Sequence, residues 1–164
     1  MSLAWRAMTP DDLDRVAQIA VIGFPNHFEG RDCFENRLAL HPAGCFVLAD
    51  DADLCGYLVA YPWTPDGAPT LNTLFAAIPG DASVMYLHDL VLTPAVRGEG
   101  WSKPGVQAVV DLARAGGWPT VALVAVNDAV AFWRGHGFEV RDTPEMAAKL
   151  ASYGSDARYM TRRI

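Results

Sequence analysis

The stretch that decides the fold is Arg97-Gly98-Glu99-Gly100-Trp101-Ser102, which separates an apolar strand from an apolar helix. The strand signal covers residues 84–92 and ends at Thr93-Pro94, and the helix signal covers residues 103–115 and ends at Gly116-Gly117. Small residues at 98, 100 and 102 let the backbone turn tightly and bring its N–H groups close to a ligand. Because unpaired N–H groups and the helix dipole attract anions at a helix start, the stretch predicts a phosphate-binding loop.

Known phosphate-binding loops differ in the residues that accompany the glycines. A Walker-type loop ends in Gly-Lys-Ser or Gly-Lys-Thr, and this stretch has neither. A dinucleotide-binding fingerprint needs a third glycine where this chain has Lys103, and an acidic residue about 20 positions further on, which is absent. The remaining pattern is Arg-x-x-Gly-x-small, and the alternative to it is a glycine-rich turn that binds no ligand.

A second segment downstream favours the ligand-binding interpretation. Residues 121–126 form an apolar run that is followed by Asn127, and residues 128–138 hold the aromatic pair Phe132-Trp133 before Gly137-Phe138. In this order and spacing, the two segments resemble the signatures of the GNAT acetyltransferase superfamily, whose loop holds the pyrophosphate of coenzyme A. The resemblance covers residues 84–138, and a weaker match extends it to nearly the whole chain.

The resemblance implies both a fold and an activity. The expected fold is of the α/β type, a central mixed and mostly antiparallel sheet flanked by helices, in one domain over residues 1–164. The expected activity is an N-acetyltransferase that moves an acetyl group from acetyl-CoA to a primary amine on a small molecule, by direct attack in a ternary complex. The alternatives are a non-catalytic domain that binds or senses acyl-CoA, and a transferase that uses another acyl group or a hydroxyl acceptor.

The resemblance also assigns the residues that hold the cofactor. The strand before the loop supplies a backbone N–H to the thioester carbonyl, the loop binds the pyrophosphate, and Asn127 binds the pantetheine or a nearby backbone group. The implied cofactor-binding residues are Leu90, Val91, Leu92, Arg97, Gly98, Glu99, Gly100, Trp101, Ser102, Asn127, Phe132 and Trp133. Lys103 and Arg114 are expected near the loop, where they would offset the acidic charge of the chain. No metal is expected.

Two polar residues interrupt the apolar strand at 84–92. Side chains alternate along a strand, so His88 is expected on the face of Tyr86 and Leu90, and Asp89 on the opposite face with Leu87 and Val91. An unperturbed histidine has a pKa close to neutral pH, which suits a general base. The alternatives are a core histidine with a satisfied hydrogen bond and a carboxylate bonded to a neighbouring loop.

The same strand resembles that of one group within the superfamily. It is similar to the His-Leu-His-x-Leu-x-Val strand of arylalkylamine N-acetyltransferases, whose two histidines help to deprotonate the amine. His88 falls on the second of these histidines, and Tyr86 stands in place of the first. The candidate catalytic residues are therefore His88, Asp89 and Tyr86.

The chain departs from the family where a general acid is expected. The tyrosine near the coenzyme A sulfur is replaced by Trp133, whose indole donates a hydrogen bond but delivers no proton at neutral pH. A thiol has a pKa of roughly 8.5, so its thiolate is already a fair leaving group. We therefore expect slower chemistry rather than none, with Tyr86, Tyr153 or Tyr159 as substitutes, and Trp133 either in the core or against the pantetheine arm.

The acceptor pocket is expected from parts of the chain outside the two signatures. These parts are the loop at 24–30, the end of the strand at 54–61 and the long loop at 62–83, and a loop of that length is usually functional or a lid. The candidate acceptor-binding residues are Phe24, His27, Phe28, Tyr61 and Trp63. Their aromatic character, with a few acids nearby, favours a small or aromatic amine over a long peptide.

Composition sets the remaining limits. With 164 residues, 51% of them hydrophobic and 20% charged, the chain has the balance of a folded protein rather than a disordered one. Its net charge of −6 argues against a nucleic-acid partner and mildly favours a cationic substrate. The three widely spaced cysteines, without a Cys-x-x-Cys pair, predict free thiols rather than zinc. No signal peptide or membrane span is apparent, so a cytoplasmic protein without a membrane partner is expected. Many members of the family are dimers, but the sequence leaves open whether this chain forms a homodimer.

Periodicity and turn residues predict the order of the elements. Strands are expected at 4–8, 46–49, 54–61, 84–92, 120–126, 138–141 and 158–163, and helices at 10–23, 31–40, 103–115, 128–136 and 145–150. The early strands form a hairpin, and the later ones alternate with helices. This combination predicts a mixed sheet.

Overall fold

The computed structural model describes residues 2–164, so residue 1 of the expected domain lies outside the described residues. Its strands are β1 (Ala4–Ala7), β2 (Cys45–Ala49), β3 (Leu54–Trp63), β4 (Val84–Leu92), β5 (Thr120–Ala125), β6 (Glu139–Val140) and β7 (Arg158–Arg163). Its α-helices are α1 (Leu13–Gly23), α2 (Arg31–Leu40), α3 (Ser102–Gly116), α4 (Val130–Arg134) and α5 (Pro144–Leu150). Short 3₁₀ turns at 10–12, 42–44, 94–96 and 151–153 join some of them.

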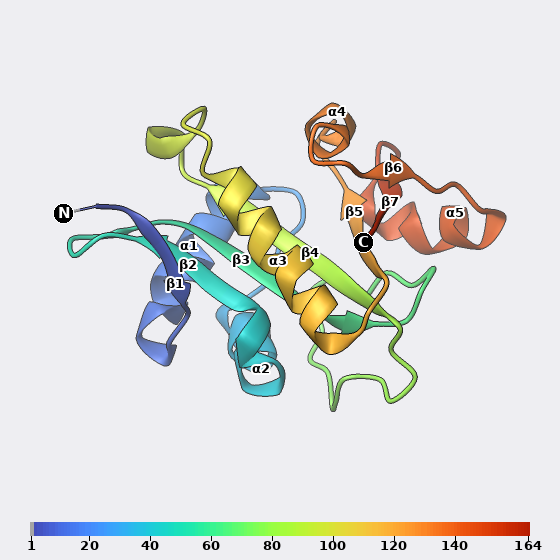
Figure 1. Ribbon diagram of the computed structural model, residues 1–164, viewed down its shortest axis with the longest axis horizontal. Coiled ribbons are helices and arrows are strands. Elements are labelled where there is room, and N and C mark those ends of the chain that lie inside the picture. The colour runs from blue at the N-terminus through green and yellow to red at the C-terminus, as the bar shows by residue number, and fades with distance from the viewer. Residues whose placement is uncertain (1) are drawn as a thin grey trace.

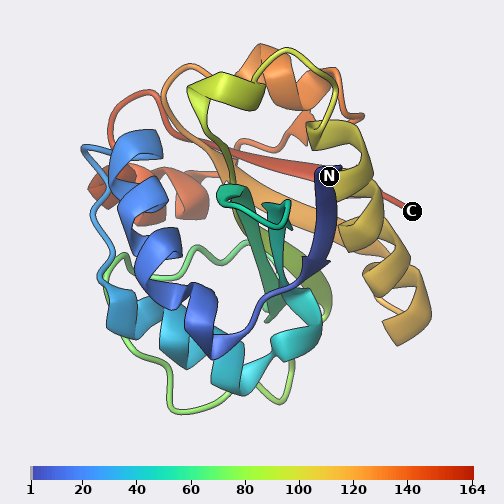
Figure 2. The same cartoon turned by 90° about the vertical axis from the view of Figure 1, so that its left-hand side faces the viewer.

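The strands form one sheet in the order β1-β2-β3-β4-β5-β7-β6. Every neighbouring pair is antiparallel except β4 and β5, which are parallel, so the predicted mixed and mostly antiparallel sheet is confirmed. Figure 2 shows the sheet between α1 and α2 on one side and α3 on the other, and Figure 1 shows α3 lying across the strands.

Each face of the sheet has its own apolar core. The inner stripe of α3 consists of Val106, Val109, Val110 and Ala113, which recur at helical spacing and pack against one face. The α1 stripe, with Leu13, Val16, Ile19 and Ala20, packs against the other face. None of the helices within residues 2–164 combines the length and the apolar character that crossing a membrane requires.

The predicted elements agree with the structure except at some ends. The helix expected at 128–136 is shorter, because Asn127 and Asp128 adopt positive φ angles of 56° and 59° and so cannot belong to a helix. The strand expected at 138–141 is reduced to β6, which has two residues.

The parallel strands β4 and β5 pair over a short distance. Their partners are Met85 with Val121 and Tyr86 with Ala122, at the beginning of each strand. Beyond this point the two strands separate, and β4 continues to Leu92 without a β5 partner. We call this opening in the sheet the fork.

A β-bulge changes the alternation that the sequence predicts for β4. Val59 of β3 pairs with Asp89, and the next residue, Ala60, pairs with Leu87, so His88 is an extra residue in β4. As a result, Leu90 packs against the α3 core and Val91 belongs to the α1 core, together with Tyr86. The expectation that Asp89 faces away from Tyr86 and His88 is therefore wrong, because the bulge shifts the alternation by one residue.

Candidate active site

Two cavities meet at the fork. The larger, of about 310 Å³, is lined by Gly23, Phe24, Leu87, His88, Leu90, Val91, Leu92, Arg97, Ser102, Leu123, Val124, Val126, Asn127, Ala129, Phe132 and Trp133. The smaller, of about 30 Å³, is lined by Phe24, His27, Glu29, Leu71, Tyr86, His88, Asp89, Val124, Val126 and Tyr153. Phe24, His88, Val124 and Val126 belong to both linings, so His88 is the titratable side chain at the junction.

The glycine-rich loop leads from the larger cavity into α3. Gly98 and Gly100 have φ angles of +80° and +86°, and a Cβ atom on either would meet no atom within 4 Å. The left-handed conformation, and not crowding by the protein, therefore requires glycine here. Arg97 ties the loop to β4 because its Nε donates a hydrogen bond to the Leu92 carbonyl oxygen at 2.9 Å. An open loop at the start of a fifteen-residue helix fits a pyrophosphate.

Positive groups gather at the start of α3. Ser102 Oγ and His136 Nε2 lie 3.2 Å apart. Burial lowers the pKa of His136, and the charges of Arg162 and Lys103 lower it further, which places both cations near this histidine. Arg114, by contrast, is in the last turn of α3 and 58% exposed, so its expected position near the loop is wrong. It lies twelve residues, or roughly 18 Å, along the helix from Ser102.

Most of the predicted cofactor-binding residues line the larger cavity. Those that do are Leu90, Val91, Leu92, Arg97, Ser102, Asn127, Phe132 and Trp133. The other four, Gly98, Glu99, Gly100 and Trp101, form the adjoining loop, where the indole of the half-buried Trp101 donates a hydrogen bond to Glu99 at 3.3 Å. Trp133 is 8% exposed and packs edge-on against Phe138, so it belongs to the core and also lines the cavity.

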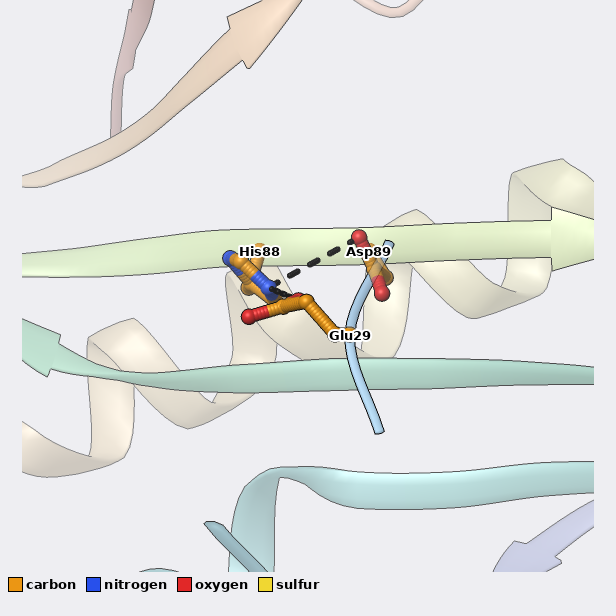
Figure 3. Close-up of side chains that lie close together, drawn as sticks. All are labelled: Glu29, His88 and Asp89. Carbon is orange, nitrogen blue, oxygen red and sulfur yellow. Dashed lines mark hydrogen bonds and ion pairs between the residues drawn. The ribbon is translucent and has the colours of Figure 1, made fainter. Parts of the chain in front are cut away.

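Glu29, His88 and Asp89 form a charged cluster in the wall of the smaller cavity (Figure 3). His88 Nε2 donates a hydrogen bond to Glu29 Oε1 and lies 3.9 Å from Asp89 Oδ1. The Tyr57 hydroxyl donates to Asp89 Oδ2 at 2.8 Å. One oxygen or nitrogen atom from each of the three side chains lies within 4.8 Å of the others, so the cluster could also coordinate a metal ion. The direct bond from His88 to Glu29 instead favours an ion pair.

The cluster changes the proton affinity of its members. Burial lowers the pKa of His88, but the charges of Glu29 and Asp89 and the hydrogen bond to Glu29 outweigh burial and raise it to about 9. The imidazole therefore holds its proton at neutral pH, and the expected unperturbed pKa is not found. Burial raises the pKa of Asp89. Burial also acts to raise the pKa of Glu29, but the positive charge of His88 brings it below its usual range.

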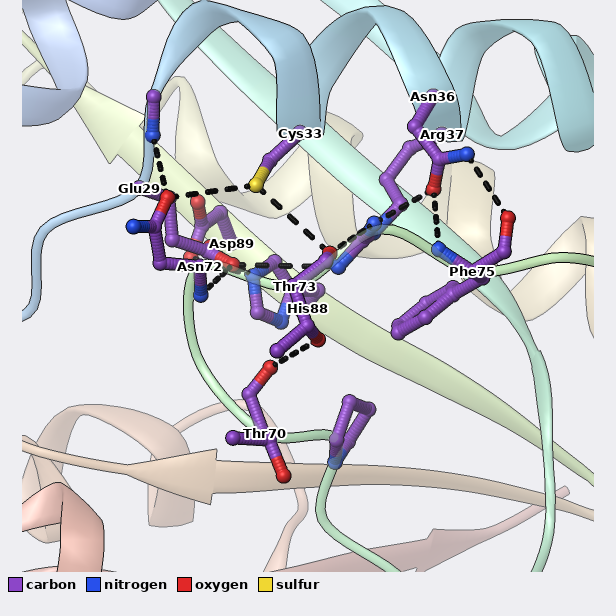
Figure 4. Close-up of polar contacts among 12 residues, drawn as sticks. Glu29, Cys33, Asn36, Arg37, Thr70, Asn72, Thr73, Phe75, His88 and Asp89 are labelled. Atoms are coloured by element: carbon purple, nitrogen blue, oxygen red, sulfur yellow. Dashed lines mark hydrogen bonds and ion pairs between the residues drawn. The ribbon is translucent and has the colours of Figure 1, made fainter.

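A polar network from α2 and the 62–83 loop supports Glu29 (Figure 4). The Asn72 backbone N–H donates to Glu29 Oε2 at 3.1 Å, and Arg37 Nη2 lies 3.9 Å from the same oxygen. Arg37 is 2% exposed, donates from Nη1 to the Thr73 carbonyl at 2.8 Å, and lies 3.5 Å from the centre of the Phe75 ring. Arg37 thus joins α2, the loop and the charged cluster.

Replacing Arg37 by alanine should destabilise the protein strongly, by about 3–5 kcal/mol, because Glu29 would keep a buried charge without this counter-ion. Urea unfolding measures the change. Arg31→Ala is the matched control on the same helix, because Arg31 pairs with Asp14 and Glu35 at the surface. We expect it to leave stability nearly unchanged. Equal effects of the two substitutions would contradict the role given to Arg37.

Some of the tyrosines predicted as substitute acids, and some of the predicted acceptor-binding residues, line the site, whereas the others lie elsewhere. Tyr86 and Tyr153 line the smaller cavity, as do Phe24 and His27. The Tyr159 hydroxyl instead accepts a hydrogen bond from the Asp66 backbone at 3.1 Å, and Tyr159 lines neither cavity.

Three predicted acceptor residues, Phe28, Tyr61 and Trp63, line neither of the two cavities. Phe28 is 60% exposed, Tyr61 is fully buried in the α1 core, and Trp63 stacks on Phe75. Their aromatic character alone does not distinguish a pocket wall from the core or the surface.

Some site residues give little signal in the sequence. Glu29 is one acid in a predicted loop, and nothing near it indicates that it contacts His88, 59 positions away. Arg37 appears as an ordinary helical arginine, and Asn72 as a residue of a long loop. A signal for Arg37 does exist, since it falls between the buried residues Phe34 and Leu38 on the inner face of α2.

Comparisons with known structures agree with this fold. The chain is similar in structure to Ard1 from Thermoplasma volcanium, with a TM-score of 0.75 and 16% identity over 100% of this chain and 99% of that one. A GNAT-like decarboxylase, GphF, in complex with isobutyryl-CoA gives 0.77 and 19% over 98% of both chains. Naa50 from Arabidopsis thaliana in complex with a bisubstrate analogue gives 0.72 and 14% over 100% of both chains.

Comparison of the amino-acid sequence with known families identifies the family of this chain. No curated protein sequence matches the chain. The model of the acetyltransferase (GNAT) family matches residues 12–138, which is more than half of the chain and includes the loop, the fork and His88. The protein therefore belongs to the GNAT family of acetyltransferases.

Proposed function

We propose that this protein transfers the acetyl group of acetyl-CoA to a small primary amine, by direct attack while both substrates are bound. The observation that carries the proposal is the meeting of two cavities at His88. The larger cavity adjoins the 97–102 loop, whose N–H groups would bind an anion, and the wall of the smaller one has two carboxylates and the protonated His88. This arrangement suits an anionic donor on one side and a cationic acceptor on the other.

The residues of the larger cavity would hold and orient the acyl donor. The N–H groups of the 97–102 loop would bind the pyrophosphate, with positive charge from Lys103 nearby. Leu90, Val91 and Leu92 lie on the part of β4 that has no β5 partner, so a backbone N–H there can stabilise the thioester carbonyl. Asn127, Phe132 and Trp133 would contact the pantetheine arm.

The residues of the smaller cavity would act on the amine. Asp89 would accept a proton from it through water, and burial strengthens Asp89 as a base by raising its pKa. Burial also raises the pKa of Tyr86 well above its usual value, so its hydroxyl keeps its proton and orients the amine as a hydrogen-bond partner. Phe24 and His27 would form the wall on the side of α1.

The smaller cavity restricts the acceptor. A water molecule needs about 10–15 Å³, so a cavity of about 30 Å³ holds little more than the amine group itself. Its lining contains the two carboxylates of Glu29 and Asp89 against one cation, the protonated His88, and no lysine or arginine, so negative charge is in excess. This negative charge would repel a carboxylate on the acceptor next to the reacting amine. Amines without a carboxylate should therefore be better acceptors than amino acids.

Phenethylamine should accordingly be acetylated with a kcat/KM about 100-fold higher than that of phenylalanine, because like charges placed together cost several kcal/mol. The two compounds differ only in the carboxylate. Phenylalaninamide has a neutral amide of similar size in place of the carboxylate, so it distinguishes the effect of charge from that of size. Its kcat/KM should be close to that of phenethylamine. A preference for phenylalanine would contradict the proposed acceptor class.

The experiment that tests the function itself is thiol release from acetyl-CoA in the presence of a panel of amines. We expect release that requires both acetyl-CoA and an amine, with the acetylated amine as the product. Tight binding of acetyl-CoA without turnover across the panel would favour a non-catalytic acyl-CoA-binding domain. Turnover with another acyl-CoA alone would favour a different acyl group.

A further inference from the structure

We propose that His88 gives a proton to the coenzyme A sulfur as the thioester breaks, so that the chain's general acid comes from the β4 bulge and not from α4. This inference rests on the proposed acetyl transfer. It begins from the absence of a usable acid at Trp133, where the family has a tyrosine. Indole is not a proton donor at neutral pH.

The lining of the larger cavity offers few alternatives. Within residues 2–164 it contains no tyrosine, lysine, cysteine or carboxylic acid. A guanidinium such as that of Arg97 keeps its proton, and the hydroxyl of Ser102 is too weak an acid. His88 is the remaining side chain of that lining that can release a proton near physiological pH.

The bulge gives His88 access to the larger cavity while Glu29 holds its ring. The hydrogen bond to Glu29 uses Nε2, and within residues 2–164 no protein group bonds to Nδ1. Figure 3 shows the second ring nitrogen on the side of the ring turned away from Asp89. Nε2 is therefore held by Glu29, and within the described residues Nδ1 has no protein partner.

The surroundings of His88 keep it protonated. Glu29 from the loop after α1 and Asp89 from β4 supply two negative charges, against one positive charge from Arg37 on α2. The other titratable groups around the ring and the smaller cavity are His27, Tyr61, Tyr86 and Tyr153. Despite burial, the pKa of His88 is raised to about 9, so a proton is present at pH 7–8.

The step balances without any further reactant. The ammonium group of the acceptor gives one proton to bulk water as it binds, and the neutral nitrogen then forms a bond to the carbonyl carbon while the carbon–sulfur bond breaks. The sulfur keeps the electron pair of that bond and takes the proton from His88. Asp89 accepts the second proton of the nitrogen, and the neutral imidazole recovers it through water, which restores the cluster.

The leaving group provides the test. His88→Gln should lower kcat by about 10²–10³-fold with acetyl-CoA. With the selenoester analogue of acetyl-CoA, whose selenolate leaves without a proton, the loss should be less than about tenfold. Equal losses with the two donors would overturn the proposal. So would a loss that disappears when the acceptor amine is already deprotonated at the assay pH, because His88 would then act as the base.

The pH dependence gives a second measurement. Because the protonated imidazole is the active form, kcat should fall as pH rises through about 9. An NMR titration of the His88 imidazole in the free protein should show the same pKa. Glu29→Gln removes a charge that raises this pKa, so both the titration and the fall in kcat should move to lower pH. A kcat that continues to rise through this range would contradict the proposal.

Two controls separate chemistry from folding and from the proposed function. His41→Gln changes a histidine that bonds to the Ala60 carbonyl and lines neither cavity, so the ratio of the two donors should stay as in the wild type. Thermal unfolding shows whether His88→Gln still folds, and Glu29→Gln, which keeps the imidazole, provides a second variant. If no amine is acetylated, the proposed function fails, whereas a failure of the inference alone leaves wild-type acetylation intact.

Discussion

Asp89→Asn should lower kcat for amine acetylation by about 10²–10³-fold, with a smaller change in the KM for acetyl-CoA. Asparagine has nearly the same shape as aspartate and can keep the hydrogen bond from Tyr57, but it cannot accept a proton from the amine. The loss should therefore appear in the chemical step. Steady-state rates with saturating acetyl-CoA measure it.

The stability of the same variant distinguishes a catalytic carboxylate from a structural one. Burial raises the pKa of Asp89, so the ionised form is disfavoured in the folded protein, and stability contributed by this group falls as pH rises through the folded pKa. Asp89→Asn should consequently unfold at the same temperature as the wild type or higher at neutral pH.

Asp12 offers a matched control for Asp89. It is also a buried carboxylate, and its ion pair with Arg6, at 2.8 Å, holds its pKa below the usual range. Stability from Asp12 is present above its unfolded pKa and is lost as pH falls. Asp12→Asn should therefore lower thermal stability at neutral pH and leave kcat unchanged. A variant of Asp89 that behaves like this control would show that Asp89 has no part in the chemistry.

Gly100→Val should weaken acetyl-CoA binding roughly 10- to 100-fold. A β-branched residue held at a φ of +86° costs of order 1–3 kcal/mol, so the loop must either adopt another conformation or bear this strain. Either change disturbs the N–H groups that we expect to bind the pyrophosphate. Isothermal titration calorimetry with acetyl-CoA measures the dissociation constant.

Gly80→Val is the control for this substitution. Gly80 also has open space around its position, but it does not have a positive φ, and it lies in the 62–83 loop away from both cavities. We expect its affinity for acetyl-CoA to equal that of the wild type. If Gly100→Val also bound acetyl-CoA normally, the assignment of the 97–102 loop to the pyrophosphate would be wrong.

The residues around the larger cavity, which would hold the acyl donor, can be predicted from the sequence because they lie close together along the chain. The end of β4, the loop and the start of α3 follow one another along the chain, as do β5, Asn127 and α4. Each of these transitions leaves a pattern of glycines or apolar residues. The sequence therefore predicts most of the larger cavity, including Asn127 and Trp133.

The residues around the smaller cavity, which would hold the acceptor, cannot be predicted in this way because they come from segments that are far apart in the sequence. Glu29, Leu71, His88 and Tyr153 come from four parts of the chain and meet only in the folded structure. Because the pKa of His88 depends on Glu29 and Asp89 together, the protonation state of the imidazole also follows from tertiary contacts. The bulge itself has no marker such as a glycine at position 88.

The extra residue in β4 has a consequence for what holds the side chain at position 88. If His88 were absent, Leu87 and Asp89 would be consecutive partners of Ala60 and Val59, and both apolar layers would keep their members. The sheet therefore does not depend on which side chain stands at 88. What constrains the side chain at 88 is therefore its contact with the buried carboxylate of Glu29, and not the pairing of the strands.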